Sequence, residues 1–280
     1  MAKRKVKKEE ISEEKTTAVE AAAVVIEKKD GRKLEIPSEI VIQPDLTVVV
    51  TYCEGDDDAD MLKYAVRSVQ KNLIGVDVNV LVVGNKKPDF VKPEDFIKAD
   101  IKSMGLWADQ WRVADLLLEN KDVNEDIVLL TPGMIVCNPC MLCNIAVVKA
   151  TPEETPSVKA LRALGLNAQD YDTHTPVFFF KDMIRRASQF KEVKACSLIT
   201  ALFSVFFNGD VQPHIIETKA GAWKNGPWLL PVISSNPQIA VLEHFFRVKN
   251  FAHFSAYSCT EAVKLFLEEK FPEKSCIEID

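Results

Sequence analysis

Short apolar runs alternate with longer amphipathic segments through the first half of the chain. Three runs are rich in β-branched residues and show no polar alternation, as expected for strands covered on both faces: residues 47–52, 78–83 and 127–130. After the first run, Leu62, Val66, Val69 and Leu73 recur at helical spacing and predict a helix with one buried stripe. Strand, helix and strand in this order predict a parallel β-α-β unit with a right-handed crossover.

The alternation continues towards the C-terminus. Further helical stripes and one strongly apolar strand are expected, in chain order, at residues 108–120, 176–180 (the strand), 195–207, 238–246 and 260–271. Together these elements predict a single α/β, Rossmann-like domain with a mostly parallel sheet and helical additions at its C-terminal end. Ligands of such sheets bind at the carboxyl ends of the strands. The loops after Tyr52, Val83 and Leu130 are therefore the candidate site.

The N-terminal region differs in character. Residues 1–20 are a run of charges that predicts a flexible, solvated tail, with docking of a protein partner as the alternative role. Residues 21–46 read as a small β-hairpin around Asp30-Gly31, a dipeptide that suits a tight turn. We expect the main domain to span residues 47–258 and a C-terminal helix and tail to span 259–280.

Composition and net charge restrict the classes of function that the chain can have. The chain has 280 residues, a net charge of −6 and seven cysteines. Nucleic-acid binding is not expected from this acidic balance, because phosphate backbones are bound by clustered positive charge. No apolar run approaches the ~20 residues of a membrane-spanning helix. The odd number of scattered cysteines indicates reduced thiols in a cytoplasmic protein.

Several common motifs are missing. The chain contains neither the G-x-G-x-x-G nor the G-x-x-x-x-G-K-[ST] phosphate-binding pattern, and it lacks the G-x-S-x-G nucleophile elbow. The triplet Cys137, Cys140 and Cys143 has zinc-like spacing but no matching fourth ligand. A helix beginning near Asn138-Pro139 would place the three on one apolar stripe, so we favour buried thiols over a metal site.

Two loops hold candidate chemistry. Asp56, Asp57 and Asp58 follow the first strand, where acids favour a helix N-terminus, and a nucleotide or metal site with Thr51 and Tyr52 is the less favoured alternative.

Asp172 and His174 precede the strand at 176–180. A carboxylate beside a histidine makes a general base, and a buried histidine that satisfies loop backbone groups is an equal alternative.

Read in order, several segments resemble a bacterial and phage glycosyltransferase-like family of GT-A architecture, including phage galactosyltransferase-like proteins and, distantly, Stealth proteins. The segments that carry the resemblance span roughly residues 47–258 and are Val48–Tyr52, Met61–Val69, Val82–Phe90, Asp172–Pro176, Phe207–Gly209, Ser234–Asn236 and Phe254–Tyr257. Each segment is weak alone, and the shared order gives the resemblance its weight.

The resemblance implies transfer of a sugar from a nucleotide-diphosphate sugar to an acceptor hydroxyl. On this hypothesis Thr51, Tyr52 and Gly84 contact the donor, and Asp172 and His174 face the acceptor hydroxyl. Arg67 and Arg112 are the cationic side chains that could neutralise the diphosphate in place of a metal.

The family also implies Mn²⁺ or Mg²⁺ held by an Asp-Asp pair after the third strand. This chain has Thr131-Pro132-Gly133 there, and Cys53-Glu54 where the family commonly has an arginine. Asp57 and Asp58 are the nearest acids that could hold the metal instead.

The sequence thus predicts a glycosyltransferase. The alternative is a non-catalytic GT-A-like binding or assembly protein, of the kind a phage could encode, that has lost the metal pair. A DNA-glucosylating enzyme is a third and weaker alternative.

Overall fold

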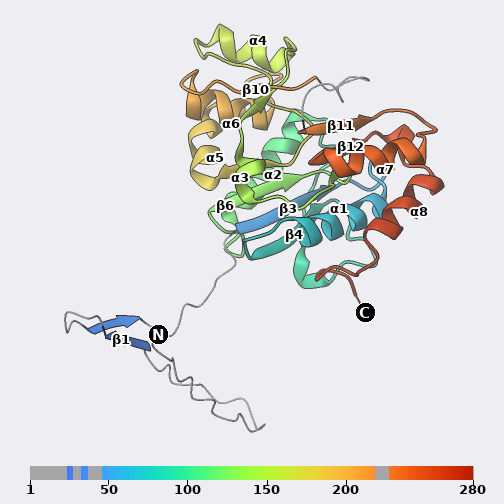
Figure 1. Ribbon diagram of the computed structural model, residues 1–280. Helices are drawn as coiled ribbons and strands as arrows, with labels where there is room; N and C mark the ends of the chain where they lie inside the picture. Colours follow the sequence, from blue (N-terminus) through green and yellow to red (C-terminus); the bar gives the residue numbers. More distant parts are fainter. Residues whose placement is uncertain (1–23, 28–32, 37–45, 218–226, 280) are drawn as a thin grey trace. The chain divides into compact units, whose positions relative to one another are not determined.

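The computed structural model describes residues 24–27, 33–36, 46–217 and 227–279 (Figure 1). The predicted charged tail and the Asp30-Gly31 turn lie outside these residues. The chain divides into two units after Gln43. In the first unit, β1 (Val24–Glu27) and β2 (Lys33–Ile36) pair antiparallel.

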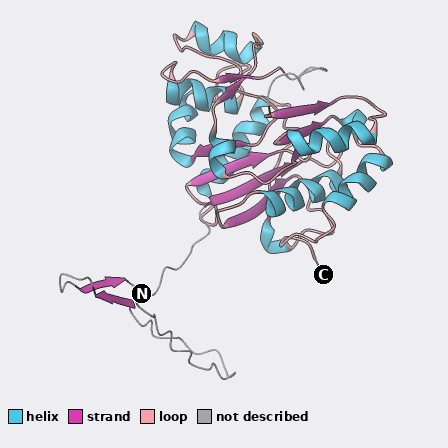
Figure 2. Ribbon diagram, in the orientation of Figure 1, coloured by secondary structure: helices cyan, strands magenta, loops and turns pink. Residues whose placement is uncertain are grey.

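A five-stranded sheet forms the centre of the second unit (Figure 2). Its strands, in spatial order, are β5 (Phe96–Lys98), β4 (Val78–Gly84), β3 (Leu46–Tyr52), β6 (Asp126–Leu130) and β9 (Val177–Phe180). The first four run parallel, and β9 runs antiparallel to β6. The predicted α/β class with a mostly parallel sheet is therefore confirmed.

The order of strands defines a switch point. The chain builds β3, then β4, then β5 outwards in one direction, and then returns to place β6 on the other side of β3. Neighbouring strands β3 and β6 consequently send their following loops apart at their carboxyl ends. In open α/β sheets, ligands bind in the crevice that this divergence leaves.

Helices cover both faces of the sheet. On one face α1 (Ala59–Asn72) buries the predicted stripe of Leu62, Val66, Val69 and Leu73 against alternate residues of β3 and β4. The other face is covered mainly by α2 (Trp107–Glu119), α5 (Lys181–Ala187) and α6 (Leu198–Phe207). Strands that are apolar without alternation are thus explained by burial on both sides.

Three short strands form a second sheet that the sequence analysis did not predict. They are β11 (Leu229–Val232), β12 (Phe251–Phe254) and β7 (Met134–Val136), in that order. They pack with α1, α7 (Ile239–Val248) and α8 (Glu261–Lys270) in a separate apolar cluster. This sheet places β12 directly beside the turn that follows β6, because the Phe254 N–H donates to the Gly133 carbonyl.

The remaining elements are short. They are η1 (Pro93–Asp95), α3 (Leu142–Ala146), β8 (Lys149–Ala150), α4 (Pro156–Ala163), η2 (Ser188–Phe190), β10 (His214–Ile215) and η4 (Ala256–Ser258). β8 and β10 pair with each other in parallel.

The prediction of three cysteines on one helical stripe is wrong. Helix α3 begins only at Leu142, because the preceding segment is tied by hydrogen bonds to the ends of other elements. Cys140 donates its N–H to the Asn72 carbonyl, and Asn138 donates to two carbonyls at the end of α7. Cys140 is consequently buried while Cys143 is exposed.

Candidate functional site

A cavity of about 330 Å³ opens at the carboxyl ends of β3 and β6. Its walls come from the loop after β3, the turn after β6 and the residues that follow β12, and are formed by Gly55, Asp56, Asp57, Asp58, Met61, Pro132, Gly133, Phe254, Ala256 and Cys259. This volume lies at the lower end of the range for small-molecule sites. The cavity occupies the switch point of the sheet, where a ligand is expected on topological grounds.

Asp58, one of the residues that line the cavity, holds the start of a helix in place. It is the N-cap of α1, and its Oδ1 accepts from the N–H groups of Asp60 (2.8 Å) and Met61 (3.3 Å). Its Oδ2 forms an ion pair with Lys264 of α8 at 2.7 Å. The favoured sequence interpretation of this loop, a capped helix start, therefore describes Asp58 well.

Asp57 is held differently. Its Oδ2 accepts the Cys53 N–H at 2.7 Å, which closes the loop. Burial, reinforced by neighbouring Asp56 and opposed by the Cys53 N–H, raises the pKa of Asp57 to about 6. A carboxyl group that is costly to ionise and lines a cavity is typical of functional sites.

The turn after β6 has no space for a side chain at Gly133. A Cβ there would lie 2.5 Å from the Phe254 carbonyl oxygen, closer than van der Waals contact allows. Thr131, Pro132 and Gly133 thus stand where the resemblance places an Asp-Asp pair, and at Gly133 the backbone of β12 leaves no room for a carboxylate side chain.

A divalent metal does not fit these residues. Within the part of the chain that the structure describes, no three His, Cys, Asp or Glu side chains gather closely enough to hold a metal ion. Asp58 is already engaged by the helix start and by Lys264, and Gly133 is closed to a carboxylate. Asp57 and Asp58 therefore line the cavity without forming the metal site for which they were candidates.

Three predicted donor-binding positions lie at the ends of β3 and β4. Thr51 is fully buried and donates to the Leu130 carbonyl at 3.4 Å. The Tyr52 side chain packs in the apolar cluster beneath the cavity and is 6% exposed. Gly84 pairs with Tyr52, and a Cβ at Gly84 would overlap the Tyr52 carbonyl oxygen. These residues support the strand ends near the site by packing and pairing, and none of the three lines the cavity itself.

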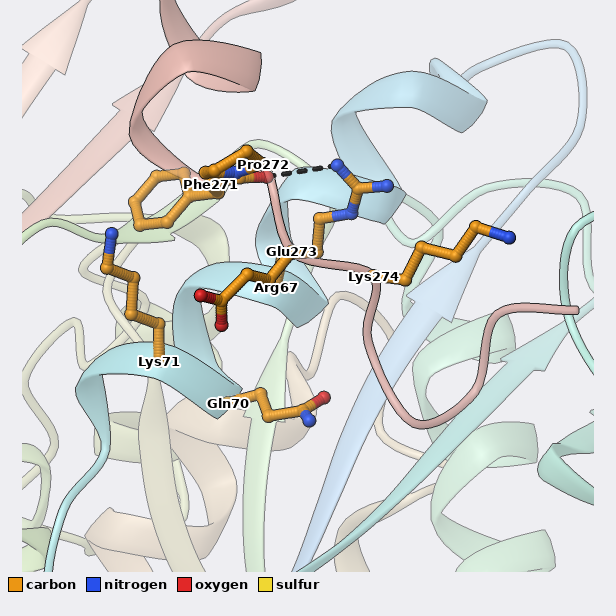
Figure 3. A pocket seen from close by; sticks show the side chains of 7 residues that line it. All are labelled: Arg67, Gln70, Lys71, Phe271, Pro272, Glu273 and Lys274. Carbon is orange, nitrogen blue, oxygen red and sulfur yellow. Dashed lines mark hydrogen bonds between the residues drawn. The ribbon is translucent and has the colours of Figure 1, made fainter. Parts of the chain in front are cut away.

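The structure places Arg67 away from the cavity. Arg67 lies nine residues beyond the N-cap of α1, about 13 Å along the helix. Its guanidinium is buried, pairs with Glu278 (2.7 Å) and Glu268 (3.1 Å), and donates to the Phe271 carbonyl (Figure 3). Two carboxylates neutralise this arginine, so it holds the C-terminal segment onto α1 and has no charge to spare for a diphosphate.

Arg112 is half-exposed on α2 and bonds to Asp109 at 2.8 Å and to the Asp100 carbonyl at 3.1 Å. It does not line the cavity. The two predicted diphosphate-binding arginines are thus not brought together. The basic groups bonded to acids of the β3 loop are Lys264, on Asp58, and Lys86, on Glu54 at 2.5 Å.

Asp172 and His174 do not line the cavity and reach its wall only through a second histidine, His253. Burial raises the pKa of Asp172, and its carboxylate accepts the backbone N–H of His174. The His174 ring is exposed and stacks on His253 of β12, with centroids 4.6 Å apart. A Cβ at Gly133 would in turn lie 3.5 Å from the His253 ring, which connects the histidines to the cavity wall.

No pattern in the sequence singled out His253, so its pairing with His174 was not predicted. The two histidines are 79 positions apart, and β12 is too short to give a strong strand signal. The available clue was that His253 directly precedes the Phe254–Tyr257 segment of the family resemblance.

No helix in the described ranges is long and apolar enough to cross a membrane. All seven cysteines are free.

Neither the protein-family models nor the curated proteins include a match to the chain. The solved structures similar to it include the galactosyltransferase LgtC in complex with donor and acceptor sugar analogues, at 10% identity and a TM-score of 0.47, covering 81% of this chain and 97% of that one. They also include the apo structure of the bifunctional glycosyltransferase WbbM, at 11% identity and a TM-score of 0.45, covering 84% of this chain and 51% of that one. These likenesses are too distant to assign an activity.

Proposed function

We propose that the chain is a glycosyltransferase-like protein that binds a nucleotide-diphosphate sugar in the cavity between β3 and β6 and transfers the sugar to an acceptor hydroxyl. The observation that carries this proposal is the position of the cavity at the switch point of the sheet, with Gly133 of its wall close to the His253 ring on which His174 stacks. The collinear resemblance to phage and bacterial GT-A proteins supports the same reading. The free cysteines support a cytoplasmic setting.

The transfer step follows from ordinary acid–base chemistry. His174 takes the proton of the acceptor hydroxyl as its oxygen forms the new bond to the anomeric carbon. The bond from that carbon to the diphosphate breaks, and the electron pair leaves with the diphosphate. Asp172 fixes the loop by accepting the His174 N–H.

One observation favours the alternative of a non-catalytic binding module. The cavity wall holds three aspartates, and the lysine that contacts it, Lys264, is already paired with Asp58 and Asp60. A departing diphosphate needs compensating positive charge. Without it, the chain would bind a saccharide or nucleoside and not complete the transfer.

A thermal-shift screen with UDP-, GDP-, CDP- and TDP-sugars tests the ligand class. Because a ligand that binds the native state alone raises Tm by mass action, the right donor should raise it. We expect the shift to persist in EDTA, since the residues do not fit a metal. Flat curves with every nucleotide, in EDTA and in Mn²⁺, would rule out the donor site.

The variant His174→Ala then distinguishes a glycosyltransferase from a non-catalytic binding module. If the chain is an enzyme, this variant should lower transfer or donor hydrolysis by ~10²-fold, the usual size of a lost general base. The donor-induced rise in Tm should remain. A wild-type chain that binds the donor but turns nothing over supports the binding module.

A further inference from the structure

His174 adopts a backbone conformation that is uncommon for a residue with a side chain. Its φ is +53°, in the left-handed region. Such a conformation is strained for a residue with a side chain and persists where the surroundings hold it. Two contacts hold it here: the backbone N–H bonded to Asp172, and the ring stacked on His253.

The stack is close and nearly parallel. The ring centroids are 4.6 Å apart and the planes differ by 15°. His253 sits on a short strand that is paired on both sides, with β11 and with β7. Its ring is therefore carried by a rigid element, whereas His174 stands exposed on a loop.

The surroundings of His253 disfavour its protonated form. Burial, followed by the neighbouring His174, lowers the pKa of His253 to about 3. The other charged groups near the pair are Asp172, which faces His174, and Asp170, which lies beside Asp172. His253 is consequently a neutral ring at physiological pH.

We propose that His253 is a positioning residue for His174. The neutral face of His253 orients the His174 imidazole beside the Pro132–Gly133 turn, and it faces the imidazolium that forms when His174 accepts the hydroxyl proton. This role rests on the proposed glycosyltransferase function for its chemistry, while the stacking itself is independent of it.

Two substitutions at His253 distinguish a role of its aromatic ring face from a role of its ring nitrogens. His253→Phe keeps an aromatic face of similar size, and His253→Ala removes it. With the donor found in the screen, we expect His253→Ala to lower kcat at least ~10-fold with donor KM unchanged, and His253→Phe to stay within ~3-fold of wild type. An alanine variant with the wild-type rate would overturn the proposal. A phenylalanine variant as slow as alanine would also overturn it, because the nitrogens would then be the essential feature.

A second measurement does not depend on activity. The full chain has four histidines, so ¹³C-labelled imidazole signals can be assigned by substitution. Between pH 5 and pH 8 we expect the His253 signal to stay constant. The His174 ring signal should move in His253→Ala, remain close to wild type in His253→Phe, and be unaffected in His244→Ala, an exposed control on α7.

Identical His174 signals in wild type and His253→Ala would show that the stack positions nothing. Because this comparison needs no donor, it can succeed or fail separately from the proposed transfer reaction.

Discussion

Replacing Asp57 with asparagine should stabilise the fold more at pH 8 than at pH 5. In the folded chain, burial raises the pKa of Asp57 from 3.8 to about 6. The folded state therefore binds this proton more tightly than the unfolded state does. The resulting stabilisation is fully present below about pH 4 and is lost as the pH rises through 6. At pH 8 the wild-type chain must bury part of a carboxylate charge that asparagine does not carry.

The magnitude follows from the same values. One pKa unit corresponds to about 1.4 kcal/mol. For a rise from 3.8 to about 6, the change between pH 5 and pH 8 is at most about 1.4 kcal/mol, and partial exposure of Asp57 reduces it to about 1 kcal/mol. The amide oxygen of asparagine can still accept the Cys53 N–H, so the loop closure is retained.

Urea denaturation of both chains at pH 5 and pH 8 measures the effect. The free energy of unfolding of Asp57→Asn, minus that of wild type, should be about 1 kcal/mol larger at pH 8 than at pH 5. Asp56→Asn is the matched control, because Asp56 is exposed and adjacent and acts on Asp57 only by reinforcing its raised pKa, so its difference should change less between pH 5 and pH 8 than that of Asp57→Asn. If the free energy of unfolding changes by the same amount between pH 5 and pH 8 in wild type and in Asp57→Asn, the reasoning is refuted.

Two further substitutions test the surroundings of the site. Arg67→Met leaves the buried carboxylate of Glu278 unpaired and should cost about 3–5 kcal/mol of unfolding free energy. A double-mutant cycle with Glu278→Gln should show strong coupling, and additive effects would count against the ion pair. Gly84→Ala forces a Cβ against the Tyr52 carbonyl and should cost about 1–3 kcal/mol. Gly105→Ala, which meets nothing closer than 3.4 Å, is its control, and equal costs would contradict the close approach.

Much of the fold could be predicted because strands and helices that pack in the core need long, regular patterns of apolar residues. The runs at 47–52 and 78–83 became β3 and β4 nearly to the residue, since strands covered on both faces leave an unmistakable signal. The helix over 195–207 was predicted too early: Ala195 has a φ of +71°, so α6 begins only at Leu198. Element boundaries depend on such local geometry, which apolar spacing does not encode.

The site was harder to predict because its contacts span long separations. Asp57 and Asp58 were identified from their place after a strand, and they do line the cavity. The pairing of Arg67 with Glu278 joins residues 211 positions apart, and nothing local to Arg67 signals it. The stack of His174 on His253 depends on a strand of four residues. Sequence position therefore indicated the strand-end loops correctly but not the partners that give each side chain its role.

The central claim is that the cavity between β3 and β6 binds a nucleotide sugar, and a calorimetric titration in EDTA tests it most directly. Ala256 is exposed on the cavity wall, so Ala256→Trp should fill the cavity without disturbing the core, whereas Tyr257→Trp changes a neighbour that does not line it. We predict that one of the four nucleotide sugars binds wild type and Tyr257→Trp with equal affinity and binds Ala256→Trp at least ~10-fold more weakly. Equal affinity for all three chains, or no binding to wild type, would contradict the account.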